Sequence, residues 1–356
     1  MPHLTDDPAL LAPEINLNPG PEYLARQWQG IPGIERAGNG RLWATWYSGG
    51  EGEGPENFVL LVTSGDDGRT WSPPVLVIDP PGEVRAYDPC LWIDPRGRLW
   101  LCWAQSEGWY DGRAGVWAVR CDDPGTATPA WTTPRRLANG VMMNKPTVLS
   151  TGEWLFPTAV WAREPHRPEL AAERRSSVLC TADGGETWTL RGGADVPDRS
   201  FDEHMVVERR DGSLWLLART KTGIGDSVST DGGRTWAPGR AQVLPGPCSR
   251  FFLRRLHSGR LLLVNHHNFT GRNNLIAFLS DDDGHTWQGG LLLDGRDQVS
   301  YPDGAQAEDG RIYVVYDRER KDAREILFAV FTEEDVLAGQ AGEGTRLRQV
   351  VNRGAE

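Results

Sequence analysis

Residues 64–71 read SGDDGRTW, and the same eight-residue pattern returns three more times along the chain. The other copies are residues 181–188 (TADGGETW), 229–236 (STDGGRTW) and 280–287 (SDDDGHTW). Each copy is typical of a turn between antiparallel strands, in which the third-position Asp accepts backbone N–H bonds. Gly at the fifth position adopts a positive φ, and the Trp packs the turn against the sheet. Four copies indicate a repeated β architecture.

A second repeat sets the number of units. A tight turn followed by apolar residues recurs at Gly40, Gly97, Gly152, Gly212, Gly259 and Gly310. The intervals of 57, 55, 60, 47 and 51 residues each hold four short strands with their loops, which is one blade of a β-propeller. The chain is therefore predicted to be an all-β, six-bladed propeller with four-stranded antiparallel blades. Residues 1–356 form one domain in this prediction, with blades starting near residues 30, 88, 145, 203, 250 and 302.

The ends of the chain and the few helical patterns complete this prediction. A strand from one terminus, near residues 10–17 or 345–351, is expected to complete the sixth blade and close the ring. Helices have little room, and residues 163–175 and 332–338 are the best candidates. The second segment opens with Thr-Glu-Glu-Asp, which is typical of a helix N-cap followed by acids in the first turn.

Composition excludes several classes of function. A net charge of −11 and a pI near 5.2 argue against a nucleic-acid partner, because binding phosphates requires clustered Lys and Arg. No apolar run reaches membrane-span length, and residues 1–14 lack a signal-peptide pattern, so we expect a cytoplasmic protein without a membrane partner. Five cysteines without a CxxC pair indicate reduced thiols. His266 and His267 are adjacent rather than spaced for one metal, so no metal or other cofactor is expected.

Propeller topology predicts which polar side chains meet. The innermost strand of each blade starts at one face, which we call the top face, and the eight-residue turns lie at the opposite face. Polar and ionisable residues gather at these strand starts, and we expect them to contact a ligand: Asp88, Lys145, Glu203, His204, Arg250, Tyr301 and Asp303. Such a concentration of charge on one axis is typical of a functional pocket.

With these motifs the chain resembles the sialidase superfamily, whose six-bladed propellers carry the same turns, called Asp-boxes. Residues 201–219 (FDEHMVVERRDGSLWLLAR) resemble the family segment with the Glu that partners a tyrosine nucleophile. The resemblance implies that Glu203 is this partner and that Arg219 binds the substrate carboxylate. Residues 300–316 (SYPDGAQAEDGRIYVVY) resemble the segment with the nucleophile, which places Tyr301 in that role.

Two further positions match the family pattern. Arg272 corresponds to another carboxylate-binding arginine, and Asp317 stands where the family has a supporting Glu. We expect Glu203, Arg219, Arg272 and Tyr301 to surround one pocket at the top face, with the Tyr301 hydroxyl near the Glu203 carboxylate.

The implied activity is retaining exo-hydrolysis of a terminal acidic sugar, with an acidic oligosaccharide or glycoside as the substrate. A carboxylate on the anomeric carbon repels a charged nucleophile, so a neutral tyrosine activated by a glutamate serves instead. A carboxylic acid must also protonate the leaving oxygen. The family uses an Asp on the loop that corresponds to residues 49–57 (GGEGEGPEN). Glu53 falls closest to that position, with Glu51 and Glu56 as alternatives.

One position departs from the family. Its first carboxylate-binding arginine belongs to an Arg-Ile-Pro motif, and this chain has Gly30-Ile31-Pro32. Either another cation fills the space above Gly30, with Arg250, Lys145 and Arg318 as candidates, or the substrate lacks the sialic-acid carboxylate.

Other functions stay open at this point. A uronic-acid-directed lyase or hydrolase would use His204 and Tyr301 as base and acid, and the glycine at position 30 favours it. A glycan-binding propeller without catalysis is a third interpretation. Glu203 and Arg219 would then form a structural ion pair, and Tyr301 would be a packed channel residue.

Overall fold

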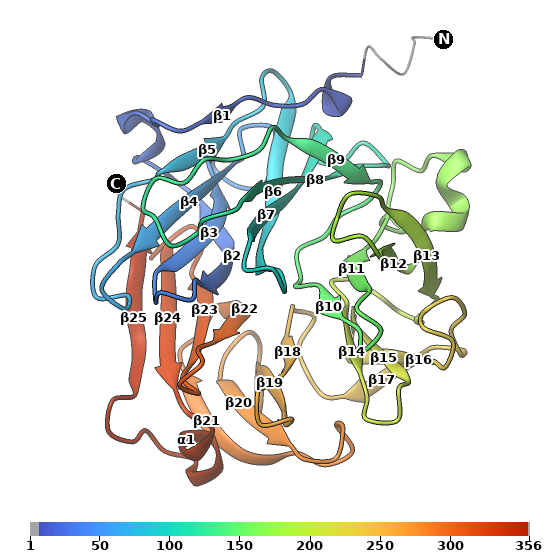
Figure 1. Cartoon of the computed structure of the whole chain (residues 1–356). Helices are drawn as coiled ribbons and strands as arrows, with labels where there is room; N and C mark the ends of the chain where they lie inside the picture. Colours follow the sequence, from blue (N-terminus) through green and yellow to red (C-terminus); the bar gives the residue numbers. More distant parts are fainter. Residues whose placement is uncertain (1–6, 355–356) are drawn as a thin grey trace.

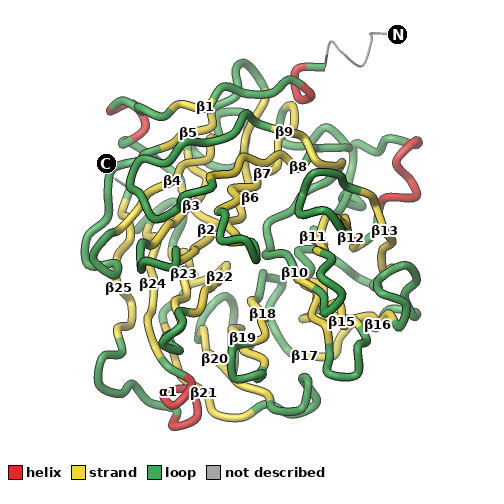
Figure 2. The backbone as a smooth tube through the Cα atoms, viewed as in Figure 1, coloured by secondary structure: helices red, strands yellow, loops and turns green. Residues whose placement is uncertain are grey.

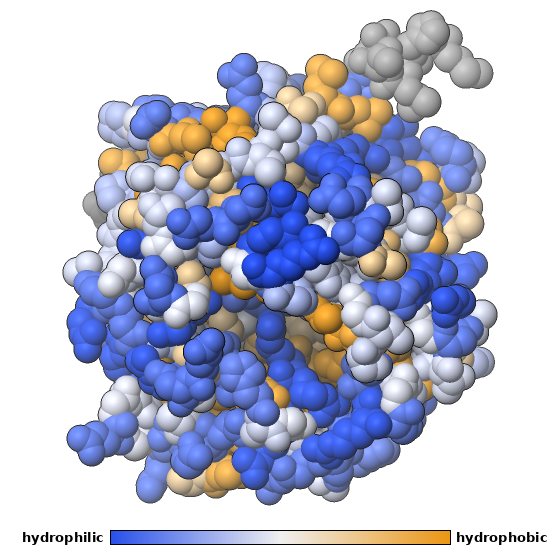
Figure 3. All heavy atoms as spheres, viewed as in Figure 1, coloured by the Kyte–Doolittle hydropathy of each residue, from blue (hydrophilic) through white to orange (hydrophobic). Residues whose placement is uncertain are grey.

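Six antiparallel sheets surround a central axis in the computed structural model, which describes residues 7–354. The ring of blades is visible in Figure 1, and the predicted six-bladed β-propeller is confirmed. Figure 2 shows how short the strands are and how little of the chain is helical. Figure 3 shows a mainly hydrophilic surface with a hollow near the middle of the ring. Residues 1–6 of the segment compared with a signal peptide lie outside the described residues.

Each blade is one continuous stretch of chain, apart from an extra strand on the first. Blade one contains β2 (Gln29–Arg36), β3 (Leu42–Ser48), β4 (Phe58–Ser64), β5 (Leu76–Ile78) and the added β1 (Ile15–Asn16). Blade two contains β6 (Val84–Ile93), β7 (Leu99–Glu107), β8 (Val116–Cys121) and β9 (Arg135–Ala138). Blade three contains β10 (Thr147–Val148), β11 (Trp154–Thr158), β12 (Ser176–Thr181) and β13 (Thr189–Ala194).

The second half of the ring repeats this arrangement. Blade four contains β14 (Met205–Glu208), β15 (Leu214–Thr220), β16 (Gly223–Ser229) and β17 (Arg240–Leu244). Blade five contains β18 (Phe252–Arg255), β19 (Leu261–His266), β20 (Leu275–Ser280) and β21 (Gln288–Asp294). Blade six contains β22 (Val299–Gln306), β23 (Ile312–Arg318), β24 (Glu325–Phe331) and β25 (Arg346–Arg353).

The two ends of the chain settle how the ring closes. β25 is the fourth strand of blade six, so the expected strand near residues 345–351 is present. The N-terminal segment pairs instead with β5 and gives blade one a fifth strand. Blades one and six are joined by contacts from β2 to the end of β23 and to the turn after it. The Ile31 N–H donates to Asp317 Oδ2 over 2.8 Å, and the Gln29 N–H donates to the Arg320 carbonyl over 3.1 Å.

The Asp-boxes hold neighbouring blades together at the bottom face. In the first box the Thr70 N–H and hydroxyl both donate to Asp66, over 2.9 and 2.6 Å. Gly68 has a φ of 76°, which favours glycine. The Trp71 ring packs edge-on against Phe328 of blade six, with centroids 5.8 Å apart. The first box thus packs its Gly and Trp against the edge of the preceding blade, and most of its polar residues face solvent.

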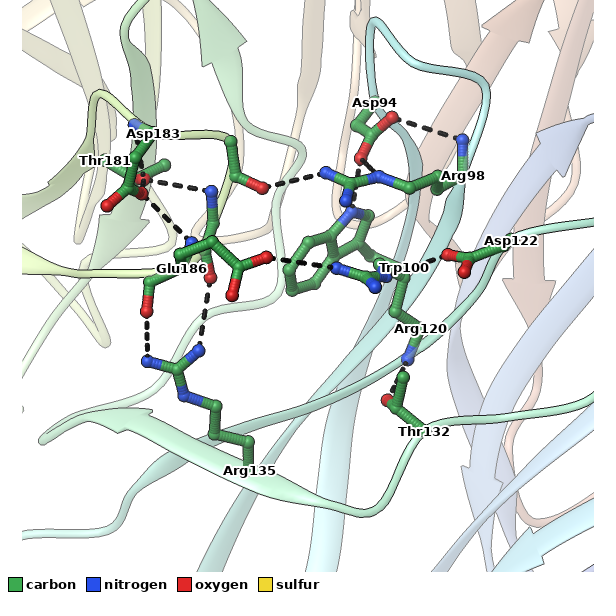
Figure 4. A network of polar contacts seen from close by, with 12 residues as sticks. Asp94, Arg98, Trp100, Arg120, Asp122, Thr132, Arg135, Thr181, Asp183 and Glu186 are labelled. Carbon is green, nitrogen blue, oxygen red and sulfur yellow. Dashed lines mark hydrogen bonds and ion pairs between the residues drawn. The ribbon is translucent and has the colours of Figure 1, made fainter.

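Guanidinium groups reinforce one such junction, between blades two and three (Figure 4). Arg98 donates to Asp94 over 2.6 Å and to the Gly184 carbonyl of the next box over 2.8 Å. Trp100 Nε1 donates to the same Asp94 carboxylate over 2.9 Å. These contacts connect blade two to the Asp-box of blade three at the bottom face.

Helical segments are few, as predicted. Thr332 caps α1 (Glu333–Ala338) through a capping box with Asp335, so the helix expected at residues 332–338 is present. The other candidate segment forms only the 3₁₀ helix η4 (Pro168–Glu173). Two more 3₁₀ turns are η2 (Pro8–Leu10), which precedes β1, and η3 (Pro21–Tyr23), which lies between β1 and β2. Within residues 7–354, no helix has the length and apolar character needed to cross a membrane.

Candidate active site

Backbone irregularities at the starts of the inner strands aim side chains at the top of the axis. The pairing register with the neighbouring strand shifts at an X-Pro pair in each of three inner strands, β2, β6 and β22. The residues preceding these prolines, Ile31, Asp88 and Tyr301, have φ of 59°, 48° and 56°. Bulges re-aim side chains, and positive φ at non-glycine residues is a strain that gathers at functional sites. Glu203, just before β14, has a φ of 42°.

One cavity at the top face receives side chains from all six blades. Its walls are Ile31, Tyr47, Glu53, Arg85, Tyr87, Asp88, Trp109, Met143, Trp161, Phe201, Glu203, Arg219, Arg272, Tyr301 and Arg320. Glu203, Arg219, Arg272 and Tyr301, which the sequence placed in one pocket, therefore do lie together. The walls combine aromatic rings with both signs of charge.

Tyr301, Glu203 and Arg219 form the centre of the cavity. The Tyr301 hydroxyl donates to Glu203 Oε1 over 2.6 Å, and Arg219 Nη1 lies 2.5 Å from the same oxygen and 2.8 Å from the Tyr301 oxygen. All three residues are buried, with 4–5% of their surface exposed. Burial raises the pKa of Tyr301, and Arg219 opposes that rise. The tyrosine is therefore neutral and can lose its proton only to a group as close as Glu203.

Two more arginines flank the Tyr301 ring. The guanidinium carbons of Arg272 and Arg320 lie 5.3 and 4.3 Å from its centroid. Arg272 Nη2 donates to the Cys248 carbonyl over 3.0 Å, which fixes its position. Arg85 completes the basic set on the other wall, 3.8 Å above the Tyr87 ring. The cavity thus contains four arginines, which are able to form charge-assisted hydrogen bonds.

The space beside Gly30 is filled by Arg320. A Cβ added at Gly30 would lie 2.8 Å from Arg320 Cδ and Nε and 2.9 Å from Cγ. The expectation that Arg250, Lys145 or Arg318 takes this place is wrong, because each is bound elsewhere. Their contacts are Lys145 with Glu35 and the Ile34 and Leu91 carbonyls, Arg250 with Asp303, and Arg318 with Glu319 and Glu325.

Two carboxyl groups of the cavity differ in environment. Glu53 accepts the Tyr47 hydroxyl over 3.0 Å, and its side chain is 34% exposed. Glu51 and Glu56, the alternatives on the same loop, are exposed and do not line the cavity. Asp88 is 3% exposed. Burial, together with nearby Glu53, raises the pKa of Asp88 to about 8, against the opposing effect of Arg85.

The raised pKa of Asp88 predicts how stability depends on pH. Asp88 is protonated in the folded protein and ionised in the unfolded chain between its unfolded value of 3.8 and about 8, so stability falls as pH rises through this range. Asp88→Asn keeps the neutral shape and removes this dependence. Thermal melts at several pH values should show that the free energy of unfolding of the variant rises relative to that of the parent by a few kcal/mol toward pH ~8. If stability changes with pH in the same way in the two proteins, Asp88 is ionised in the folded protein throughout this pH range.

His204 and Asp303 lie outside the cavity, contrary to expectation. His204 Nε2 is 2.7 Å from the Ser177 carbonyl oxygen, and burial lowers the pKa of His204 to about 4. Asp303 accepts the Ile34 N–H over 2.9 Å and lies 3.2 Å from Lys145 Nζ. An internal charge cluster in the central channel of the propeller thus consists of Lys145, Glu35, Asp303 and Arg250. Within residues 7–354, no three metal-ligating side chains come together.

No sequence pattern indicated Arg85 or Arg320 as cavity residues. Arg85 precedes the Asp88 bulge by three residues on β6, and Arg320 lies in the turn after β23. The inner-strand starts show which residues approach the axis, but a long side chain that reaches in from a turn has no pattern of its own. Arg85 donates to Asn57 Oδ1 over 3.2 Å, so it also fixes the loop that carries Glu53.

Comparisons with known proteins identify a family and proteins of similar fold. Residues 40–314 match the family model described as a BNR repeat-like domain. A 91-residue segment is 37% identical to a sialidase from Paraclostridium sordellii, covering 25% of this chain and only 21% of that protein. The solved Hadza microbial sialidase Hz136 has a TM-score of 0.70 at 20% identity, over 88% of this chain and 67% of the other. The intramolecular trans-sialidase from Ruminococcus gnavus has a TM-score of 0.68 at 14% identity, over 89% and 96%.

These likenesses differ in what they establish. At 20% identity and below, structural similarity shows the fold alone. The family model spans most of the chain, including the four Asp-boxes and all the cavity residues except Ile31 and Arg320. The chain therefore belongs to the BNR repeat-like domain family and has the six-bladed propeller fold of the sialidases.

Proposed function

We propose that the protein is a sialidase-type retaining exo-glycosidase that removes a terminal acidic sugar, sialic acid or a related one, from an oligosaccharide. The observation that carries this proposal is the Tyr301 hydroxyl bonded to Glu203 Oε1 at 2.6 Å, in a cavity that also contains four arginines. The partial identity to a sialidase supports the same class of activity. A structural ion pair alone would not require a strained tyrosine beside it.

The proposed reaction has two steps. Tyr301 oxygen attacks the anomeric carbon while its proton passes to Glu203, and Glu53 donates a proton to the departing glycosidic oxygen. In the second step Glu53 accepts a proton from water, whose oxygen attacks the same carbon, and Glu203 returns its proton to the departing Tyr301 oxygen. Two displacements at one carbon retain its configuration. Asp88, protonated near neutral pH, is the second candidate for the acid.

Arg219 and Arg272 supply the proposed binding of the substrate carboxylate. Arg272→Ala should weaken binding of an acidic ligand by about 1.5–3 kcal/mol, because one charge-assisted contact is lost. The loss should appear in KM and in the Kd of a competitive acidic sugar more than in kcat. Arg69→Ala, which removes an exposed arginine from the Asp-box face, is the control and should change neither constant. An unchanged Kd for Arg272→Ala would exclude this arginine from the binding site.

The alternatives make different predictions in one assay. A panel of acidic-sugar glycosides would be followed by NMR for product configuration and by absorbance for an unsaturated uronate. Retained configuration without an absorbing product supports the glycosidase, and an absorbing product indicates a lyase. The lyase mechanism that relies on His204 has lost its support, because this side chain contacts the Ser177 carbonyl instead of the cavity. A cytoplasmic location, one domain over residues 1–356, and the lack of cofactor, nucleic-acid and membrane partners stay predictions.

A further inference from the structure

We propose that Arg320 is a third carboxylate-binding arginine of the cavity, and that Gly30 is glycine because the Arg320 stem must pass beside it. This inference rests on the proposed function, since it assumes a substrate with a carboxylate. It assigns to the turn after β23 a specificity role that the inner strands alone do not supply.

Arg320 is anchored so that its guanidinium is held at the cavity wall. Asp317, which is fully buried, accepts Arg320 Nε over 2.9 Å and the Ser300 hydroxyl over 2.7 Å. Arg320 Nη2 lies 3.4 Å from Ser300 Oγ, and Nη1 lies 3.9 Å from Glu53 Oε1. The side chain is 17% exposed. An anchored guanidinium loses little conformational entropy when it binds a carboxylate.

The charges around Tyr301 show what this guanidinium is positioned to bind. Arg219 contacts the phenol oxygen at 2.8 Å, and Arg272 and Arg320 lie within 5.3 and 4.3 Å of the ring centroid. Arg219 pairs with Glu203 and Arg320 pairs with Asp317. These pairs leave three guanidinium groups against two carboxylates around the ring, so an anion that bridges the guanidinium groups is favoured. A carboxylate held above Tyr301 would place the attached anomeric carbon next to the phenol oxygen.

Gly30 is constrained by space and not by backbone conformation. It is absent from the glycines that have positive φ, so an alanine could adopt its backbone. The side chain that an alanine would meet first is Arg320, at 2.8 Å. Gly30→Ala therefore displaces Arg320 and nothing else among the nearest three atoms.

The experiment measures binding, so it does not depend on turnover. Calorimetric Kd values for sialic acid and glucuronic acid would be compared with those of their methyl esters, which lack the charge. The variants are Arg320→Ala, Gly30→Ala, both together, and Gly30→Arg combined with Arg320→Ala. Arg318→Ala is the matched control, because this neighbouring arginine pairs with Glu319 and Glu325 outside the cavity. Thermal melts verify that each variant is folded.

The proposal predicts a specific pattern. Arg320→Ala should weaken binding of the preferred acid by at least about tenfold and leave its ester unaffected. Gly30→Ala should weaken binding of the preferred acid when Arg320 is present, and it should have no further effect in the Arg320→Ala background. Gly30→Arg with Arg320→Ala should recover part of the preference for acid over ester, because a guanidinium returns to the same space.

Other outcomes overturn distinct claims. If Arg320→Ala still prefers the acid to its ester while Arg272→Ala does not, Arg320 does not bind the carboxylate. The proposed acidic-sugar glycosidase is unaffected by that result. If Gly30→Ala weakens binding equally in both backgrounds, Gly30 does not act through Arg320. If the parent binds no acid better than its ester, both this inference and the proposed substrate class are wrong.

Discussion

Tyr301→Phe is expected to lower kcat by about three to six orders of magnitude and to leave the Kd of an acidic-sugar ligand nearly unchanged. The substitution removes the nucleophilic oxygen, and the ring stays between Arg272 and Arg320, with Glu203 still paired to Arg219. Steady-state kinetics on a substrate that the parent cleaves, together with calorimetry on the sugar product, would measure both quantities.

The chain offers a matched control for this substitution. Tyr313 is also buried and also donates its hydroxyl to a carboxylate, Asp67 Oδ1 at 2.6 Å, but it lies near the Asp-boxes. Tyr313→Phe should reduce stability without reducing kcat. Near-parental turnover of Tyr301→Phe would exclude tyrosine catalysis. A ligand that binds but is never cleaved, by the parent or the variant, would favour the non-catalytic glycan-binding propeller.

Glu203→Gln is expected to produce the second largest loss, about two to four orders of magnitude in kcat. The amide keeps the size of the side chain and its contact with Tyr301 but cannot accept the phenol proton. It also leaves the Arg219 guanidinium buried without its charge partner, so the free energy of unfolding should fall as well. Kinetics and chemical denaturation of the same preparation separate the two effects.

Glu35→Gln is the control for that separation. Glu35 pairs with Lys145 at 2.8 Å in the channel, outside the cavity. Both substitutions remove one member of a buried ion pair, so both should destabilise the fold, but only Glu203→Gln should abolish turnover. If the two variants lose activity in proportion to stability, Glu203 has a structural role only.

The fold was predictable because its signals are local. An Asp-box needs its Asp, Gly and Trp within one turn, and this chemistry can be read directly from the sequence. The same holds for the helix cap at Thr332. Residues 10–17 were a candidate strand for blade six, but their pairing with β5 as the fifth strand of blade one was not predictable, because two residues that pair at a sheet edge have no distinctive pattern.

The part of the site that lies at the starts of the inner strands was predictable. Tyr301 reaches the cavity at the bulge of β22, and Glu203 reaches it from a backbone position with positive φ just before β14. Lys145 and Arg250 start their strands in the same way, yet they point into the channel, toward Glu35 and Asp303. Sequence shows that these residues are near the axis but not how far along it their charges lie. Arg320 enters from a turn that no motif marks.

Trapping the covalent glycosyl-enzyme intermediate shows directly whether Tyr301 is the nucleophile. A slowly turning-over acidic glycosyl fluoride would be reacted with the protein, which would then be digested with trypsin and analysed by mass spectrometry. Tryptic peptide 297–311 contains Tyr301 as its single tyrosine, whereas Glu53 and Asp88 fall in peptides 42–69 and 86–96. Catalysis by a tyrosine nucleophile predicts one glycosyl group on peptide 297–311, at Tyr301, and none on the Tyr301→Phe variant. A label on either of the other peptides, or rapid turnover without any label at Tyr301, would contradict it.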